Sequence, residues 1–223
     1  MKRQTWIHTS IALLLSTILF AYISCNSGVY DNLTITQPIL DSLSNPPQEP
    51  WIWIRENTKT HYTSEQGLSI ELEPGSLMGG GQGVKNILVR PLPINASMVE
   101  AQVEFDPELQ YEQAGLILYN DDDSYIKLVK EFVDGKPWIV MGVEIDAKNP
   151  MVKKVPVSGS KVKLRFRFNE ESIQGIWVDH DNTETIAGAY DFPMKPRPCI
   201  GLFTQNAHPP NQCRAAFSDF RIE

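Results

Sequence analysis

The stretch QAGLILYNDDDSYIKLVKEFVDGKPWIVMGVEID, residues 113–146, contains three candidate β-strands and two sharp turns. Its second turn, Asp134-Gly135, lies between two runs of alternating character. Asp-Gly is typical of a two-residue type I′ hairpin loop, because both residues adopt a positive φ there. This turn fixes the register of the two strands. The predicted cross-strand pairs are Val133 with Lys136, Glu131 with Trp138, Val129 with Val140, Lys127 with Gly142 and Tyr125 with Glu144.

The predicted hairpin has two unlike faces, because side chains alternate along a strand. One face is apolar apart from Lys130 and is predicted to be core; it holds Ile126, Leu128, Phe132, Ile139, Met141, Val143 and Ile145. The other face mixes aromatic rings with charged groups. Pro137 donates no ladder hydrogen bond, so it fits best beside the turn.

Alternation of apolar and polar residues continues elsewhere in the chain, at 68–73, 101–106 and 161–168. Turn-forming clusters such as Gly79-Gly80-Gly81 and Asp179-His180-Asp181-Asn182 separate these segments. No window has the apolar stripe of a helix. We therefore expect about ten to twelve short strands, each with one buried face, in an all-β, two-sheet antiparallel sandwich.

Length and charge limit the class of protein. The chain has 223 residues and a net charge of −7, which is enough for one sizeable domain and argues against nucleic-acid binding. The one basic alternation, KVKLRFRF at 161–168, is interpreted as the solvated outer face of a strand.

The N-terminus has the pattern of a secretory signal. Lys2 and Arg3 precede an apolar run, Ile11–Ile23, that is shorter than the roughly 20 residues needed to span a membrane comfortably. Ile23-Ser24-Cys25 resembles a bacterial lipobox, in which Cys25 would be lipidated and become the mature N-terminus, although Tyr22 stands where leucine is usual.

These features predict a signal peptide at 1–24, a tether at 25–47 and a folded domain at 48–223. The segment 26–47 lacks periodicity and ends in Pro46-Pro47, which is typical of a linker. The expected location is extracytoplasmic, anchored to the membrane through the lipid on Cys25. The alternative is a plain secreted protein.

Cys199 and Cys213 form an even pair in an oxidising compartment, where a disulfide can form. In a direct hairpin about residues 207–210 they would be out of register by about five residues, or about 16 Å, which is too far to bridge. They could be bonded only if the strands are arranged differently. Both the bonded and the unbonded state therefore remain as interpretations.

Several motifs together resemble a known family. They are Trp51-Ile52-Trp53, Gln113-Ala114-Gly115-Leu116, the acidic turn before Tyr125, Lys127, Glu131 followed by Asp134-Gly135, and Phe217-Ser218-Asp219-Phe220-Arg221-Ile222. Residues 48–223 resemble the concanavalin A-like lectin/glucanase superfamily, in particular bacterial family of unknown function 1349 and the C-terminal domain of family 43 β-xylosidases. The resemblance implies a jelly roll and leaves the activity open, because such folds host many functions.

Glu144-Ile145-Asp146 is similar to the acidic strand of retaining glucanases, which makes catalysis one interpretation of this segment. Retaining chemistry needs two carboxyl groups about 5–5.5 Å apart. The third acid of the glucanase pattern is missing, because Ala147, Lys148, Asn149 and Pro150 follow. We therefore predict no catalytic residues, and a glycoside hydrolase is the alternative.

The polar face of the hairpin is the predicted binding site, with an aromatic ring to stack on a pyranose and polar groups to bond its hydroxyls. Gly142 leaves room beside Lys127. The candidate ligand-binding residues are Tyr125, Lys127, Glu131, Trp138, Glu144 and Gln113. The competing interpretation is a Lys127–Glu131 ion pair that only fills the face.

The sequence thus favours a non-catalytic protein that binds carbohydrate or a glycan-bearing surface; the further alternative is an envelope module that binds another protein. No cofactor or metal is expected. The acidic turn Asn120-Asp121-Asp122-Asp123 lacks the interrupted spacing of a calcium loop, and a structural calcium near the termini, through Asp219, is left open.

Overall fold

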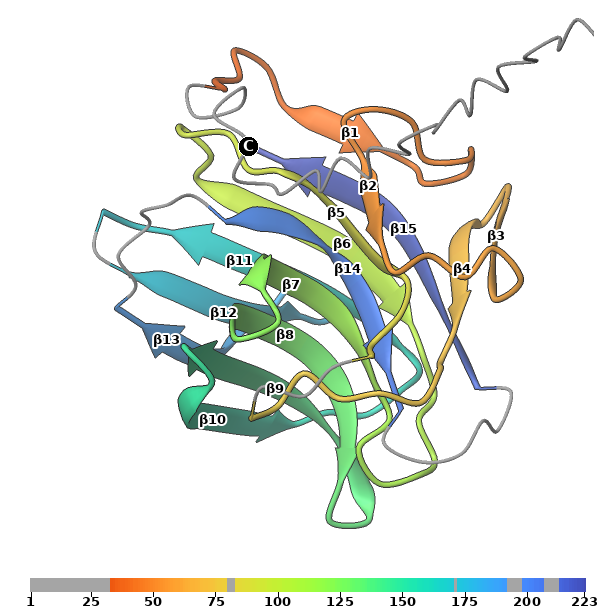
Figure 1. Ribbon diagram of the computed structural model, residues 1–223. Helices are drawn as coiled ribbons and strands as arrows, with labels where there is room; N and C mark the ends of the chain where they lie inside the picture. The colour runs from red at the N-terminus through yellow and green to blue at the C-terminus, as the bar shows by residue number, and fades with distance from the viewer. Residues whose placement is uncertain (1–32, 80–82, 171, 192–197, 207–212) are drawn as a thin grey trace, which may run out of the picture.

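The computed structural model describes residues 33–79, 83–170, 172–191, 198–206 and 213–223 (Figure 1). Within these ranges the chain forms fifteen strands and no helix, so the all-β prediction is confirmed. Accordingly, the described residues include no helix with the length and hydropathy needed to cross a bilayer. The strand number exceeds the expected ten to twelve because three strands span only three or four residues, too few for alternation to reveal. These are β1 (Ile39–Asp41), β2 (Ile52–Ile54) and β3 (His61–Ser64).

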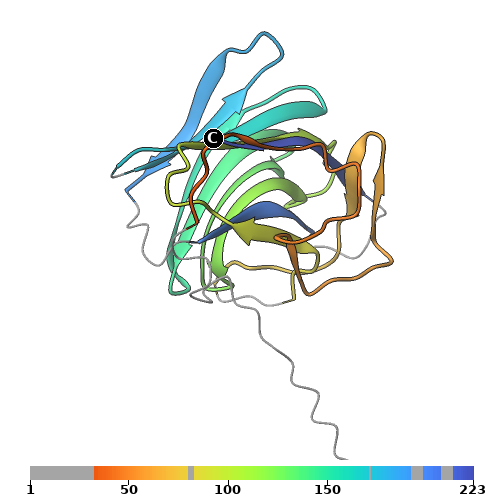
Figure 2. The ribbon, with the colours of Figure 1, turned by 90° about the horizontal axis from the view of Figure 1, so that it is seen from above.

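Two antiparallel sheets lie face to face, as a view from above shows (Figure 2). The first, the β6 sheet, has the order β13 (Glu184–Tyr190), β12 (Ile173–Val178), β11 (Lys161–Phe168), β6 (Met98–Glu104), β15 (Arg214–Ile222), β4 (Gly67–Glu71) and β3, with β1 also paired to β15. The second, the β8 sheet, has the order β10 (Lys148–Pro156), β9 (Lys136–Ile145), β8 (Ser124–Val133), β7 (Gln113–Asp121), β14 (Cys199–Gln205), β5 (Ile87–Pro91) and β2.

The main core fills the space between the two sheets. Leu116 and Leu128 from the β8 sheet meet Val103, Leu164 and Phe217 from the β6 sheet, and all five are fully buried. Most of the hairpin face predicted to be apolar core lies here, namely Ile126, Leu128, Ile139, Met141 and Val143, while Ile145 packs against its margin and Phe132 is only half-buried. Burial of such side chains supplies most of the stability of a sandwich.

The β8–β9 hairpin has the predicted register at every pair. Tyr125 lies opposite Glu144, Lys127 opposite Gly142 and Glu131 opposite Trp138. The turn residues Asp134 and Gly135 have φ values of 54° and 79°, as a type I′ turn requires. Pro137 lies beside the turn, opposite Phe132.

Lys130, the charged residue on the core face, is fully buried. Its ammonium donates to the carbonyl oxygens of Phe105 and Gly159, both at 2.6 Å, and lies 4.0 Å from the Asp106 carboxylate. The loops after β6 and before β11 therefore solvate the amine in place of water. Burial lowers the pKa of Lys130, with Asp106 opposing that shift.

The predicted tether is wrong for residues 33–47, which form part of the sandwich. Ile39 pairs with Ile222, Leu43 is buried, and the indole N–H of Trp51 donates to Asp41 Oδ2 at 2.8 Å. The segment was missed because one short strand and one buried leucine produce no periodicity. The predicted signal peptide, Cys25 and the remainder of the predicted tether lie outside the described residues.

The disulfide considered between Cys199 and Cys213 is not formed, because Cys213 carries a thiol. The two residues belong to opposite sheets. Cys199 begins β14 on the outer face of the β8 sheet, whereas Cys213 precedes β15 and packs against the main core. Burial raises the pKa of the Cys213 thiol to about 11, so the group stays protonated near neutral pH.

Candidate ligand-binding site

The outer face of the β8 sheet carries a second apolar cluster, and the segment between β4 and β5 covers part of it. Leu77 and Val84 of this segment are buried against Ile117, Tyr119 and Tyr125. We call the described residues 74–79 and 83–86 the roof. Figure 1 shows this stretch, coloured gold to yellow, passing over the β8 sheet.

The roof is fixed to strands on both sides of the sheet centre. The backbone N–H of Leu77 donates to Gln205 Oε1 on β14 at 3.2 Å, and that of Gly79 donates to Glu144 Oε1 on β9 at 2.7 Å. The hydroxyl of Tyr125 donates to the other oxygen, Glu144 Oε2, at 3.0 Å. Burial, and then the Glu144 carboxylate, raise the pKa of Tyr125, so its hydroxyl remains a donor.

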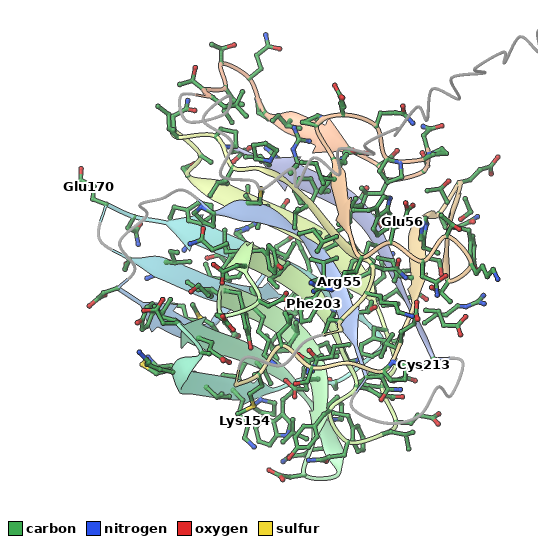
Figure 3. The ribbon with its side chains drawn as sticks, viewed as in Figure 1. Arg55, Glu56, Lys154, Glu170, Phe203 and Cys213 are labelled. Carbon is green, nitrogen blue, oxygen red and sulfur yellow. The ribbon has the colours of Figure 1, made fainter. Side chains whose placement is uncertain are left out.

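A second anchor ties the roof to the acidic turn. Arg55 binds Asp122 through two parallel hydrogen bonds of 2.8 Å and donates from Nε to the carbonyl oxygen of Val84 at 2.6 Å. Tyr119 also donates to Asp122 Oδ1 at 2.7 Å, and its pKa is raised by burial and then by that carboxylate. Arg55 and Phe203 project over the middle of this sheet (Figure 3). The acidic turn is therefore a structural ion-pair site.

Among the described residues, no group of three or more His, Cys, Asp or Glu side chains is placed to hold a metal ion. At the acidic turn, both carboxylate oxygens of Asp122 already accept hydrogen bonds from Arg55. Asp219, the other residue considered for calcium, accepts a hydrogen bond from the neighbouring Ser218 hydroxyl at 3.3 Å.

A cavity of about 610 Å³ lies on the same sheet face, between the roof and the hairpin. Its lining comprises Ser76, Met78, Tyr111, Gln113, Lys127, Glu131, Val133, Val140, Val152, Lys154 and Gln205. Lys154 marks the β10 end of this region in Figure 3. The volume falls within the roughly 300–1,000 Å³ typical of small-ligand sites.

Three polar side chains of the lining contact one another, and we call Gln113, Lys127 and Glu131 the polar triad. The Lys127 ammonium donates to Gln113 Oε1 at 2.6 Å and to Glu131 Oε2 at 3.4 Å, and Gln113 Nε2 lies 3.5 Å from Glu131 Oε1. The triad forms because β7–β8 pairing sets Gln113 opposite Glu131, while Lys127 runs along the sheet over Gly142.

All six residues predicted from the sequence lie on this face, but they divide into two groups. Gln113, Lys127 and Glu131 line the cavity. Tyr125 and Glu144 are buried, bonded to each other, and Glu144 also accepts the roof's hydrogen bond, so neither lines the cavity.

Trp138 does not provide the expected stacking surface. Its ring is covered by the ammonium groups of Lys136 and Lys154, 4.5 and 4.6 Å from the ring centroid. Its indole N–H donates to the Val133 carbonyl at 2.9 Å. Trp138 therefore supports the hairpin end of the cavity and is itself absent from the lining.

Sequence reasoning missed Tyr111 and Gln205. Tyr111 lines the cavity with 47% of its surface exposed, and its backbone N–H donates to the Phe132 carbonyl, which fixes a left-handed backbone with φ 67°. Its position two residues before Gln113 was the available signal. Gln205 lies opposite Gln113 through β14–β7 pairing, which local pattern does not reveal.

The model of the β-xylosidase C-terminal concanavalin A-like domain family matches residues 44–223. No curated protein sequence matches the chain.

Solved structures share the fold at low sequence identity. A GH43 protein from Bacillus licheniformis has a TM-score of 0.73 at 16% identity, over 82% of this chain and 39% of its own. A xylan β-1,4-xylosidase from Bacillus halodurans C-125 has a TM-score of 0.70 at 17% sequence identity. The match covers 85% of this chain and 40% of the xylosidase. The chain therefore spans about two fifths of these proteins. A β-1,3-glucanase from Mycobacterium marinum has a TM-score of 0.58 at 11% sequence identity. The match covers 83% of this chain and 97% of the glucanase.

Proposed function

Because the chain belongs to the family of β-xylosidase C-terminal concanavalin A-like domains, we propose that it is a non-catalytic carbohydrate-binding domain whose site is the cavity around the polar triad. The observation that carries the proposal is the meeting of Lys127, Glu131 and Gln113 in one cavity with the half-exposed ring of Tyr111.

The lining has the donors and acceptors that sugar hydroxyls need. An ammonium group donates, a carboxylate accepts, and an amide does both, so vicinal hydroxyls can be bonded at one place. Tyr111 offers a flat ring for the apolar face of a pyranose, and Met78, Val140 and Val152 supply apolar walls. Partial burial of Lys127 and Glu131 strengthens such contacts because less water competes for them.

The arrangement of acids supports binding over hydrolysis. Two-carboxylate hydrolysis needs a second acid within about 10 Å, and one of the pair must be protonated. Glu131 is the one carboxylate among the described residues of the lining, and it is paired with Lys127. Glu144 is buried under the roof, and Asp146 is exposed in the β9–β10 turn, so the two acids do not share a strand face.

We further propose that the domain acts outside the cytoplasm, held at the membrane through lipidated Cys25, where it binds a glycan-bearing surface. Support for this comes from the basic start, the apolar run and the Ser24-Cys25 junction of the sequence. Because the family is named for β-xylosidases and one similar solved structure is named as a xylan β-1,4-xylosidase, neutral β-linked xylose oligosaccharides are the first ligands to test.

The test is a titration of the full chain with xylohexaose, combined with a broad glycan array. Lys127→Met keeps the aliphatic stem over Gly142 but removes the ammonium, and should weaken binding about tenfold or more, since a charged hydrogen bond contributes roughly 1.5–3 kcal/mol. Lys161→Met, on the other sheet, is the matched control and should bind normally. Absence of binding to any glycan on the array would contradict the proposal.

A further inference from the structure

We infer that the cavity receives the end of a neutral glycan chain and does not admit an internal stretch of it. This inference rests on the proposed function and adds the class of ligand. Two features carry it: the cavity is closed beyond Lys127, and its charges are already paired within the protein.

The sheet face beyond Lys127 is filled by the protein's own residues. Along β8 the next side chain on this face is Tyr125, about 7 Å away at strand spacing. Tyr125 is buried, bonded to Glu144, and covered where Leu77 and Val84 pack on the sheet. With Gly79 also bonded to Glu144, no room remains for a sugar to continue past Lys127.

The neighbouring side of the cavity is closed as well, and the other sides are open. Toward β14 the roof touches the sheet through the hydrogen bond from Leu77 to Gln205. Toward the hairpin end Tyr111 is 47% exposed, and toward β10 Val152 is 56% exposed. A ligand therefore enters past Tyr111 or Val152, and its leading sugar meets the polar triad.

Geometry at the triad favours a terminal sugar. Lys127 and Glu131 keep only 17% and 7% of their side-chain surfaces exposed, so a sugar must enter deeply to bond them. A sugar inside a chain carries a glycosidic bond on both sides. The two open sides adjoin, one along the strands past Tyr111 and one across them past Val152, so a chain that enters by one and leaves by the other would have to bend sharply at the triad. A terminal sugar presents hydroxyl groups on its leading side, which suit an ammonium, a carboxylate and an amide.

The charge pattern favours a neutral sugar. The two cations among the described residues of the lining each have a carboxylate partner: Lys127 lies 3.4 Å from Glu131, and Lys154 lies 2.9 Å from Asp134. An anionic sugar would have to compete with Glu131 for Lys127 while lying beside that carboxylate, and like charges brought together out of water repel each other strongly.

The experiment uses the full chain in detergent and calorimetric titration with unbranched neutral xylan, before and after partial cleavage by an endo-xylanase. At equal mass of sugar, we expect the number of binding sites to rise in proportion to the number of chain ends. Xylo-oligosaccharides capped with glucuronic acid at either the non-reducing or the reducing end identify the end that enters the cavity. A cap on the entering end should weaken binding at least tenfold, and a cap on the other end should not.

The outcomes separate the inference from the proposal beneath it. An equal number of sites before and after cleavage, with binding still lost in Lys127→Met, would overturn chain-end recognition and leave carbohydrate binding intact. Tighter binding of an acid-capped oligosaccharide would overturn the neutral class. No heat with polymer or fragments would overturn both the inference and the proposed binding of xylose chains.

Discussion

Lys127 lies directly opposite Gly142 in the β8–β9 hairpin, and a Cβ atom at position 142 would come within 2.7 Å of Lys127 Cε. Gly142→Ala should therefore push the lysine stem aside without displacing backbone. Because the obstructing atom belongs to a flexible side chain, we expect unfolding free energy to change by less than about 1 kcal/mol, while xylohexaose affinity falls several-fold. Titration and thermal unfolding of the same variant check both; unchanged affinity would contradict the role given to Lys127.

Tyr111 is the aromatic residue that lines the cavity, whereas Trp138 is the one expected there from the sequence. Tyr111→Ala should reduce affinity about tenfold, because it removes the exposed ring of the lining. Trp138→Ala should reduce affinity less, because its faces are already occupied by Lys136 and Lys154. A larger loss for Trp138→Ala, at equal stability, would restore the sequence-based assignment.

Asp122 couples the acidic turn to the roof through Arg55. Asp122→Asn removes the ion pair and one acceptor of the Tyr119 hydroxyl, so stability should fall by about 1 kcal/mol, discounted for partial exposure. At this chain length that is a Tm shift of roughly 2–4 °C. Asp123→Asn, in the same turn but exposed, is the matched control and should leave Tm unchanged. An equal shift in both variants would mean that turn charge, and not the Arg55 contact, matters.

Lys130 gives a pH signature. Burial lowers its pKa in the folded protein below the roughly 10.4 of an unfolded lysine. Between those two values the unfolded state binds more protons, so stability rises with pH relative to a variant without the amine. The unfolding free energy of the wild type minus that of Lys130→Met should therefore become more positive as pH approaches about 10.4. Denaturant titrations at several pH values measure this difference; a constant difference would mean that Lys130 keeps its ordinary pKa.

Lipidation of Cys25 predicts both a covalent label and a location in the cell. Metabolic labelling with radioactive palmitate should mark the wild-type chain and place it in the membrane fraction. Cys25→Ser should lose both the label and the membrane association while retaining sugar binding. An unlabelled wild-type protein would favour the plain secreted alternative.

Local patterns in the sequence were sufficient for the hairpin. Asp134-Gly135 defines the turn, and alternation on either side assigns each residue to a face, because turn geometry and the two-residue period act between near neighbours in the chain. The same reasoning put Lys127 and Glu131 on one surface, and alternation elsewhere in the chain predicted the sandwich that the family resemblance also implies.

Tertiary structure alone decided what that surface became. The roof reaches Glu144 from Gly79, 65 residues earlier, and contacts Gln205 from Leu77, 128 residues earlier. Such contacts depend on the order of strands in the sheets and on which loop fills an exposed apolar face, and no periodicity encodes either. They buried Tyr125 and Glu144, while β10 brought Lys154 onto Trp138. The long polar face predicted from the hairpin was thereby reduced to a cavity closed beyond Lys127.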